Sequence, residues 1–227
     1  MVRAVIDTGT MITLSSTCLM NVFKTFVKTN HLELFISNTV AQESVWRPLT
    51  NKRFALNAAR IKHAMNSGII TTIPVTPEIL SLQQRILTLA NNAFTTTHGP
   101  LSIIQGGEAE ALALAKLYDA HALFIDERTT RALIENPARL KQVLERRQEQ
   151  AVHVNEQNLT TLRALFPKLL MFRSVDLIAT AYQQKLFDGE LAHGTLELEA
   201  ALYAAKYAGC AVSENEILDY LRTNPKA

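Results

Sequence analysis

Two short apolar runs that each end at a carboxylate decide the fold: Val2-Arg3-Ala4-Val5-Ile6-Asp7 and Ala122-Leu123-Phe124-Ile125-Asp126. Their length and their β-branched and aromatic residues are typical of buried strands. In a parallel α/β sheet, the carboxyl ends of the strands lie at one edge, and ligands bind there. We therefore expect Asp7 and Asp126 to share a site, although they lie far apart along the chain.

Strand-like and helix-like segments alternate around these two runs. The other strand-like segments are residues 32–36, 69–75, 152–154 and 169–172, and residues 95–105 read as a loop. Helical patterns cover residues 11–27, 51–67, 77–94, 108–118, 129–150 (divided at Pro137), 158–166, 174–186, 197–208 and 214–221. This alternation predicts an α/β fold with a mostly parallel sheet and helices on both of its faces.

Composition limits the class of protein. A chain of 227 residues with 48% hydrophobic content can bury a full core, and we expect one domain over residues 1–227 with an insertion or extension at about 130–170. Lys and Arg total 23 against 21 acids, so the net charge of +2 gives no argument for nonspecific polyanion binding. A local basic rim on such a chain would still suffice for nucleic acid.

Cysteine usage and hydropathy bear on the compartment. Cys18 and Cys210 form no metal-like or redox-like pair, so we expect two buried, unpaired thiols in a reducing compartment. The chain enters a strand at once, without a charged leader and a long apolar core. No apolar run approaches the roughly 20 residues that span a bilayer. We therefore expect a soluble, cytoplasmic protein without a membrane partner.

Two glutamates are placed where they can join Asp7 and Asp126. Glu108 follows Gly106-Gly107 in the first turn of a helix, and Glu43 lies one turn after the capping sequence 37–39. Each acid alone has an ordinary explanation as a turn, cap or solvated helix residue. Gathering four acids is costly unless a cation neutralises them, and Mg²⁺ or Mn²⁺ with oxygen ligands is the usual solution. Such ions activate water and stabilise the charge that develops in phosphodiester cleavage.

At this point the chain resembles the PIN-domain nuclease family. Val5-Ile6-Asp7-Thr8-Gly9-Thr10 looks like the family's opening strand and first acid, and residues 37–43, which end at Glu43, are similar to its second motif. Residues 107–115 resemble the third motif in the subgroup with Glu at that position, and residues 124–128 resemble the fourth. The resemblance covers residues 1 to about 131, and residues 173–221 resemble the closing helices less specifically.

The resemblance implies a three-layer α/β/α fold and a metal-dependent ribonuclease centre at Asp7, Glu43, Glu108 and Asp126. Asp7 and Asp126 would be the principal ligands of Mg²⁺ or Mn²⁺, Glu108 would complete the cluster, and Glu43 would bind the ion or orient the attacking water. Thr8 would hydrogen-bond Asp7 or the scissile phosphate. The chain departs from the commoner pattern in having Glu as its third acid. It also has a long 130–170 segment, which would cover the site or form an interface.

Residues beside the four acids leave alternatives open. Glu127 directly follows a strand end and is an alternative ligand, whereas Glu110 should face elsewhere because it lies about 200° around the helix from Glu108. Arg128 and Arg131 either contact a phosphate backbone or form salt bridges to Glu127 and Glu135.

The region after Glu43 offers weaker candidates. Lys52 and Arg53 have the same two alternatives, contact with a phosphate backbone or salt bridges to carboxylates, but they lie farther from the four acids in the sequence. Trp46 either stacks on a base or packs at a helix end. The six histidines share no metal-like spacing.

The function that follows from the resemblance is endoribonuclease activity on RNA. Many relatives are toxins of toxin–antitoxin pairs, often dimeric and silenced by a small partner protein, and others process RNA. The alternative is a noncatalytic module for RNA binding or assembly. A third reading takes Asp7-Thr8-Gly9-Thr10 as the phosphate loop of a sugar kinase or actin-like ATPase, but those proteins need two such lobes and further glycine-rich loops, which this chain lacks.

Overall fold

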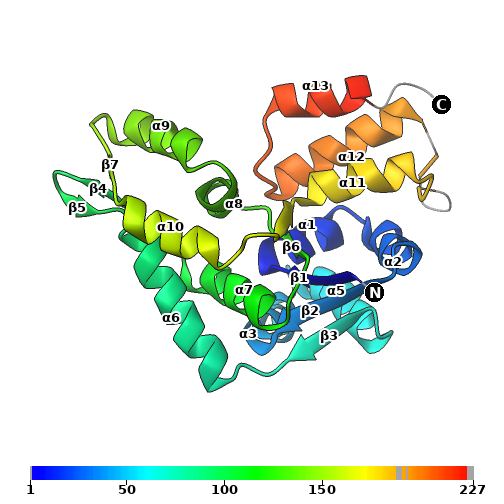
Figure 1. Ribbon diagram of the computed structural model, residues 1–227. Helices are drawn as coiled ribbons and strands as arrows, with labels where there is room; N and C mark the ends of the chain where they lie inside the picture. The colour runs from blue at the N-terminus through cyan, green and yellow to red at the C-terminus, as the bar shows by residue number, and fades with distance from the viewer. Residues whose placement is uncertain (1, 188–190, 193, 224–227) are drawn as a thin grey trace.

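A five-stranded parallel sheet forms the centre of the computed structural model, which describes residues 2–187, 191–192 and 194–223 (Figure 1). In spatial order its strands are β3 (Ile70–Ile73), β2 (Leu32–Ser37), β1 (Val2–Ile6), β6 (Ala122–Phe124) and β8 (Leu170–Phe172). Every pairing in this sheet is parallel. The predicted α/β fold with a mostly parallel sheet is therefore confirmed.

Helices cover both faces of the sheet, because the side chains of each strand alternate between two cores. Ala4 and Ile6 of β1 enter one buried cluster, and Val5 enters the other. The first cluster is covered by α1 (Thr8–Ser16), α2 (Met20–Thr29), α5 (Ala55–Asn66), α11 (Ser174–Gln183) and α12 (Thr195–Ala208), and the second by α6 (Pro77–Asn91) and α7 (Gly106–Leu117). The three-layer α/β/α arrangement is thus confirmed. None of the described helices is both long and apolar enough to cross a membrane.

The register of the sheet brings the ends of β1 and β6 together. Ile6 is paired with Phe124, and the backbone N–H of Asp7 donates to the carbonyl of Phe124 over 2.9 Å. Asp7 and Asp126 therefore leave neighbouring strands at the same edge of the sheet, as the two apolar runs predict.

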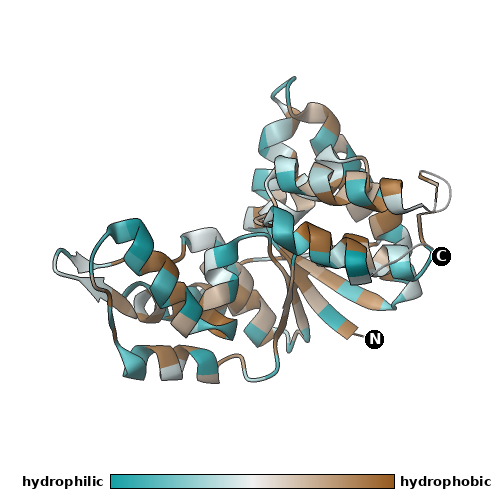
Figure 2. Cartoon of the chain, turned by 90° about the horizontal axis from the view of Figure 1, so that it is seen from above, coloured by the Kyte–Doolittle hydropathy of each residue, from teal (hydrophilic) through white to brown (hydrophobic). Residues whose placement is uncertain are grey.

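An arm extends from the sheet on the side of α6 (Figures 1 and 2). It contains α8 (Arg128–Glu135), α9 (Pro137–Gln148) and α10 (Glu156–Ala164), together with a small antiparallel sheet. That sheet joins β4 (Phe94–Thr96), β5 (Gly99–Pro100) and β7 (His153–Val154). The expected loop at 95–105 is thus partly wrong, because residues 94–100 form a hairpin that pairs with the 130–170 segment. This segment shares the hydrophobic cluster of α6 and α7.

The apolar stretch 11–27 forms two helices instead of one. α1 ends at Ser16 and α2 starts at Met20, and between them Cys18 has a left-handed backbone with φ of 62°. This conformation is unusual for a residue with a side chain and breaks the helix. It also turns Cys18 outward, so the expectation of two buried thiols is wrong for Cys18 and confirmed only for Cys210.

Candidate functional site

We call the carboxyl edge of β1 and β6, where Asp7 and Asp126 lie, the acidic edge, and Asp7 occupies its centre. It is the N-cap of α1, and its Oδ2 accepts from the backbone N–H of Gly9 over 3.2 Å. Burial raises the pKa of the Asp7 carboxyl, the backbone N–H groups of Gly9 and Thr8 lower it, and the charges of Asp126 and Glu43 raise it further, with a net rise. A carboxylate with other acids around it and a raised pKa is a place where a cation would be stabilised.

Glu43 reaches this edge from a widened helix turn. Its side chain is exposed, and its Oε2 accepts from the Thr8 hydroxyl over 3.2 Å. The helix that carries it runs through α3 (Asn38–Ala41), the π-helix η1 (Gln42–Trp46) and α4 (Arg47–Leu49), and Ser37 caps its start by accepting from the N–H of Val40. π-helical turns are rare and recur at functional sites. Thr8, expected to bond Asp7 or phosphate, therefore holds Glu43 through its hydroxyl group.

Glu108 caps its own helix. Its Oε2 accepts from the backbone N–H of Gln105 over 2.6 Å, which forms a capping box at the start of α7. Burial raises the pKa of Glu108, the Gln105 N–H lowers it, and the charges of Glu127 and Asp7 raise it further, with a net rise. Glu108 is thus within electrostatic reach of Asp7. Glu127 is exposed and caps α8 by accepting from the N–H of Thr129 over 3.0 Å.

Glu110 is buried against the helix that carries Glu43. It is 4% exposed, its Oε2 accepts from the Thr39 hydroxyl over 3.1 Å, and its Oε1 has no hydrogen-bond partner among the described residues. Thr39 lies one helical turn before Glu43, so Glu110 points inward, next to the helix that carries Glu43. The signal for this was present in the sequence: apart from Glu110, residues 109–115 are Ala and Leu on all sides of the helix, and every residue of this stretch is buried.

A prediction about stability follows from the Thr39–Glu110 contact. Thr39→Val keeps the shape of the side chain but removes the donor to Oε2 of buried Glu110, whose Oε1 already has no partner among the described residues. We expect the free energy of unfolding to fall by about 1–3 kcal/mol. Urea unfolding of the parent, of Thr39→Val and of Thr25→Val, an exposed control on α2, measures the effect. Equal losses in the two variants would contradict it.

Asp126 is the most firmly held of the predicted acids. It is 4% exposed, its Oδ1 accepts from the Ser174 N–H over 2.7 Å, and its Oδ2 accepts from the Ser174 hydroxyl over 3.0 Å. Its carbonyl accepts from the N–H of Ala211 over 3.2 Å. Burial and then the Asp126 charge raise the pKa of the neighbouring Cys210 thiol to about 12. Asp126 therefore fixes the start of α11 while its charge acts on Asp7, and Ser174 is a supporting residue whose sequence pattern indicates only a helix cap.

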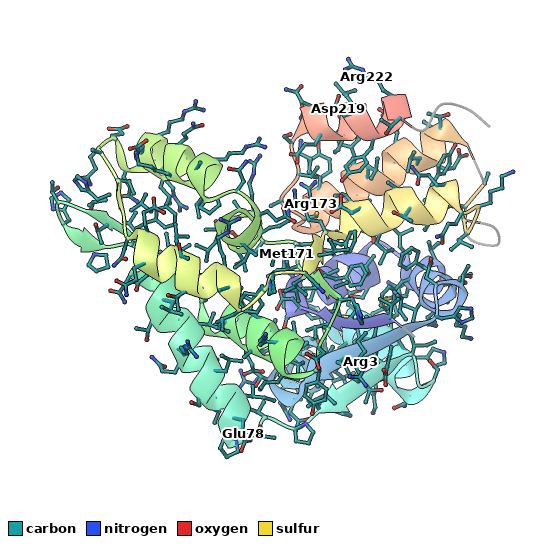
Figure 3. All side chains as sticks on the ribbon, in the orientation of Figure 1. Arg3, Glu78, Met171, Arg173, Asp219 and Arg222 are labelled. Atoms are coloured by element: carbon teal, nitrogen blue, oxygen red, sulfur yellow. The ribbon has the colours of Figure 1, made fainter. Side chains whose placement is uncertain are left out.

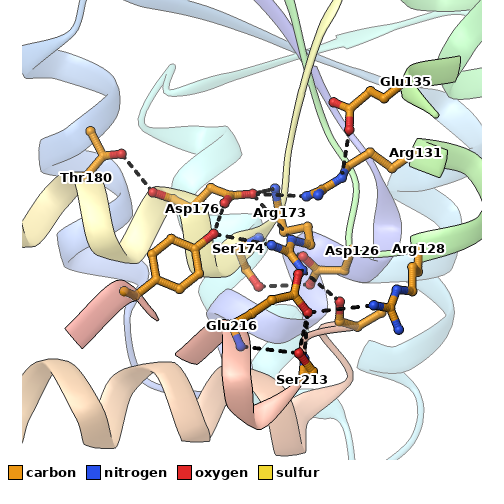
Figure 4. A network of polar contacts seen from close by, with 12 residues as sticks. Asp126, Arg128, Arg131, Glu135, Arg173, Ser174, Asp176, Thr180, Ser213 and Glu216 are labelled. Atoms are coloured by element: carbon orange, nitrogen blue, oxygen red, sulfur yellow. Dashed lines mark hydrogen bonds and ion pairs between the residues drawn. The ribbon is translucent and has the colours of Figure 1, made fainter. Parts of the chain in front are cut away.

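Behind Asp126, Arg173 is the centre of a polar network that joins α11 to α13 (Glu214–Thr223) (Figure 4). Its Nη1 donates to Glu216 Oε1 over 2.9 Å and to the carbonyl of Ala211 over 3.0 Å, and its Nε lies 3.5 Å from Asp176 Oδ2. Tyr220 donates a hydrogen bond to Asp176. Burial would lower the pKa of Arg173, but the charges around it, chiefly Asp176, raise the pKa above its usual value.

Arg128 and Arg131 belong to the same network. Arg128 lies 3.8 Å from Glu216, and Arg131 lies 3.1 Å from Glu135 and 3.5 Å from Asp176 (Figure 4). Of the two alternatives, contact with a phosphate backbone or a salt bridge to a nearby glutamate, the structure shows the salt bridge for Arg131, with Glu135 as the partner. For Arg128 the acidic partner is Glu216, from the far end of the chain, and not Glu127.

The pKa of Glu216 leads to a second prediction. Burial would raise this pKa, but hydrogen bonds from Ser213 and the charge of Arg173 lower it to about 2, against 4.5 for an ordinary glutamate. A lowered folded-state pKa gives stability that is present above the unfolded pKa and is lost as the pH falls toward the folded value. We expect the free energy of unfolding to fall between about pH 4.5 and pH 2, and Glu216→Gln to flatten part of that slope. Urea unfolding at pH 5 and pH 3 tests this, with the exposed Glu214→Gln as a control that keeps the slope.

The acids at this edge offer only oxygen ligands, which suits a hard divalent cation. In the described part of the chain, however, no three His, Cys, Asp or Glu side chains already stand together in a way that could hold a metal ion. An ion would have to draw the carboxylates around Asp7 closer, and the free Oε1 of buried Glu110 is a further oxygen on the neighbouring element.

Comparisons of this chain with models of protein families, with curated proteins and with solved structures find no match. The α/β/α class rests on the structure itself. The activity has to be argued from the chemistry of the acidic edge.

Proposed function

We propose that the chain is a divalent-metal-dependent endoribonuclease whose phosphodiester substrate lies over Asp7 at the carboxyl edge of the sheet. The observation that carries this proposal is geometric: Asp7 and Asp126 leave paired strands at one edge of the sheet, and the hydroxyl of Thr8, next to Asp7, donates to Glu43. Ligands of parallel α/β sheets bind at this edge. A cluster of carboxylates there is costly without a cation.

The ligands proposed for Mg²⁺ or Mn²⁺ are Asp7, Glu43, Glu108 and Asp126. When bound, such an ion lowers the pKa of a water and offsets the charge that develops on the phosphate. The protein would hold these groups in different ways. Ser174 fixes Asp126 through two hydrogen bonds, and Thr8 fixes Glu43 beside Asp7. Glu43 is exposed, so its carboxylate can orient the attacking water and accept its proton.

The proposal predicts cleavage of RNA that depends on Glu43. Incubation of labelled single-stranded RNA with the protein and Mn²⁺ should yield new ends, and chelation with EDTA should prevent them. Glu43→Gln keeps the side chain's size and loses the charge, so we expect cleavage to slow by a factor on the order of 100. Glu33→Gln removes the same charge from the amino-terminal part of β2, where Glu33 pairs with Arg3, and should cleave at the parent rate. Equal rates in the two variants would exclude Glu43 from the reaction.

One observation favours the alternative of a noncatalytic module for RNA binding or assembly. Glu108 caps α7 and Asp126 holds the start of α11, so two of the acids already have structural roles. A protein in which the acids serve only these roles would bind no Mn²⁺ at this edge. Measurement of Mn²⁺ binding therefore separates the two functions.

A further inference from the structure

One continuous stretch of the chain contains no acidic residue. Between Glu43 and Glu78 the sequence has none of the chain's 21 acids, although it has basic residues on an otherwise nearly neutral chain. None of these cations forms an ion pair with the described residues. They are Arg47, Lys52, Arg53, Arg60 and Lys62. An unpaired positive surface of this kind is suited to a polyanion.

Two large aromatic rings are exposed on the same stretch. Trp46 is 42% exposed and Phe54 is 46% exposed. Each ring has a cation over it: the Lys62 ammonium lies 5.1 Å from the centre of the Trp46 ring, and the Arg53 guanidinium lies 5.3 Å from the centre of the Phe54 ring. We call Trp46, Arg47, Lys52, Arg53, Phe54, Arg60 and Lys62 the basic aromatic surface.

The basic aromatic surface begins at the acidic edge. Trp46 is the last residue of η1, the same five-residue π-helix that carries Glu43. From there the surface follows α4 and α5. α5 is fixed to α1, because Arg60 donates to the carbonyl of Ser15 at the C-terminal end of α1 over 2.9 Å. Asp7 caps the same helix α1 at its other end.

The far end of the surface opens into a cavity between α2 and α5. Lys24, Arg60 and His63 line it, the cavity volume is about 410 Å³, and no acidic side chain is among its lining residues. Positively charged side chains therefore extend from the π-helix that carries Glu43, across α5, to Lys24 on α2. By contrast, Arg128 and Arg131, on the other side of the acidic edge, are already paired with carboxylates.

We propose that the basic aromatic surface binds single-stranded RNA, with bases stacked on Trp46 and Phe54 and phosphates paired with the cations around them. Exposed aromatic rings interleaved with Lys and Arg are the common way in which proteins hold single strands, because every base has a face that can stack. A duplex hides those faces, so the rings select unpaired nucleotides. The inference deepens the proposed function. It rests on that function in one respect, namely that the bound RNA strand leads to the proposed cleavage site at Asp7.

Binding is tested without metal, so that cleavage plays no part. Trp46 is the single tryptophan of the chain, and its fluorescence reports stacking directly. We titrate the full chain in EDTA with a dye-labelled 12-nucleotide uridine strand and with a hairpin duplex of equal charge, and follow both dye anisotropy and tryptophan emission. The expected result is quenching of Trp46 by the single strand and at least tenfold weaker binding of the duplex.

Three variants locate the binding surface. Phe54→Ala should weaken single-strand binding about tenfold while Trp46 still reports it. Lys52→Gln with Arg53→Gln should weaken binding and reduce the slope of log affinity against log salt concentration by about 0.7 per cation. Tyr207→Ala is the matched control, because Tyr207 is 78% exposed and also has a nearby cation, Lys206, but lies on α12. It should bind as the parent does. Unchanged melting temperatures show that the variants fold.

The outcomes separate this inference from the proposed function. Metal-free binding that depends on Phe54, together with an absence of cleavage in Mn²⁺, supports the RNA surface and rejects the nuclease. RNA binding that leaves Trp46 emission unchanged, or that Phe54→Ala and the double variant do not affect, overturns the RNA surface. Failure to bind RNA at micromolar protein, with binding of an acidic protein instead, also overturns it.

Discussion

Asp7→Asn should abolish metal-dependent cleavage and, in the absence of metal, make the protein more stable than the parent. Asn keeps an oxygen that can accept from the Gly9 N–H, and it is as good an N-cap as Asp, so α1 should form normally. What the variant lacks is the negative charge at the centre of the acidic edge. We expect cleavage to fall on the order of 100-fold or more, the size of effect that disturbed metal sites show.

The gain in stability follows from the sign of the pKa shift. Burial raises the folded-state pKa of Asp7 above its ordinary value of 3.8. The parent therefore loses stability as the pH rises from about 4 through the folded-state pKa, and the loss persists at neutral pH. Asp7→Asn escapes this loss. Thermal unfolding in EDTA at pH 7 should give a higher melting temperature for Asp7→Asn than for the parent, and Glu33→Gln should give no such rise. A lower melting temperature for Asp7→Asn than for the parent would show that the negative charge of Asp7 stabilises the parent, and would contradict this prediction.

Arg173→Met should lower the free energy of unfolding by about 3 kcal/mol, because it removes the buried cation at the centre of a partly exposed network of charges. Arg173 is 4% exposed, and its removal leaves Asp176 and Glu216 without their shared cation. Arg173 also directly precedes Ser174, whose N–H donates to Asp126. We therefore expect the Arg173→Met substitution to loosen the position of Asp126 as well.

Arg222→Met is the matched control for this prediction. Arg222 lies at the surface of α13, where it pairs with Asp219 three residues earlier, and both residues are marked in Figure 3. An exposed pair of this kind contributes about 0–1 kcal/mol. Urea unfolding of the two variants at pH 7 should therefore differ by several kcal/mol. Similar free energies of unfolding for Arg173→Met and Arg222→Met would contradict the stabilising role assigned to the network around Arg173.

The sequence predicts those features that local patterns determine. The runs that end at Asp7 and Asp126 are short, apolar and bounded, so their strand character could be inferred, and the alternation with helices indicated the parallel sheet. The break at Cys18 could not be inferred in the same way. It depends on a left-handed residue, Cys18, that carries no glycine signal. The polar run Ser15-Ser16-Thr17 before it is the local sign of a boundary, but hydroxyl residues alone do not distinguish a helix end from a polar turn within a helix.

Contacts between distant segments were the other limit. The pairing of β4 with β7 joins residues 94–95 to 153–154. A strand at 152–154 was expected, but no local pattern connects it to residues 94–96, which read as the end of a helix and the start of a loop. Arg128 has its acidic partner at Glu216, which no spacing rule connects to it. For Glu110, the helical angle from Glu108 was right, but only the structure shows that the buried side of α7 faces the helix that carries Glu43.

The metal ion is the element on which the proposed chemistry depends, and calorimetric titration with Mn²⁺ at pH 7 measures it without any need for the natural RNA. We predict that the parent and Glu33→Gln take up Mn²⁺ with the same affinity, and that Asp7→Asn binds it at least tenfold more weakly. Binding of Mn²⁺ that is equal in the parent and Asp7→Asn, or no binding to the parent at millimolar concentration, would contradict the account.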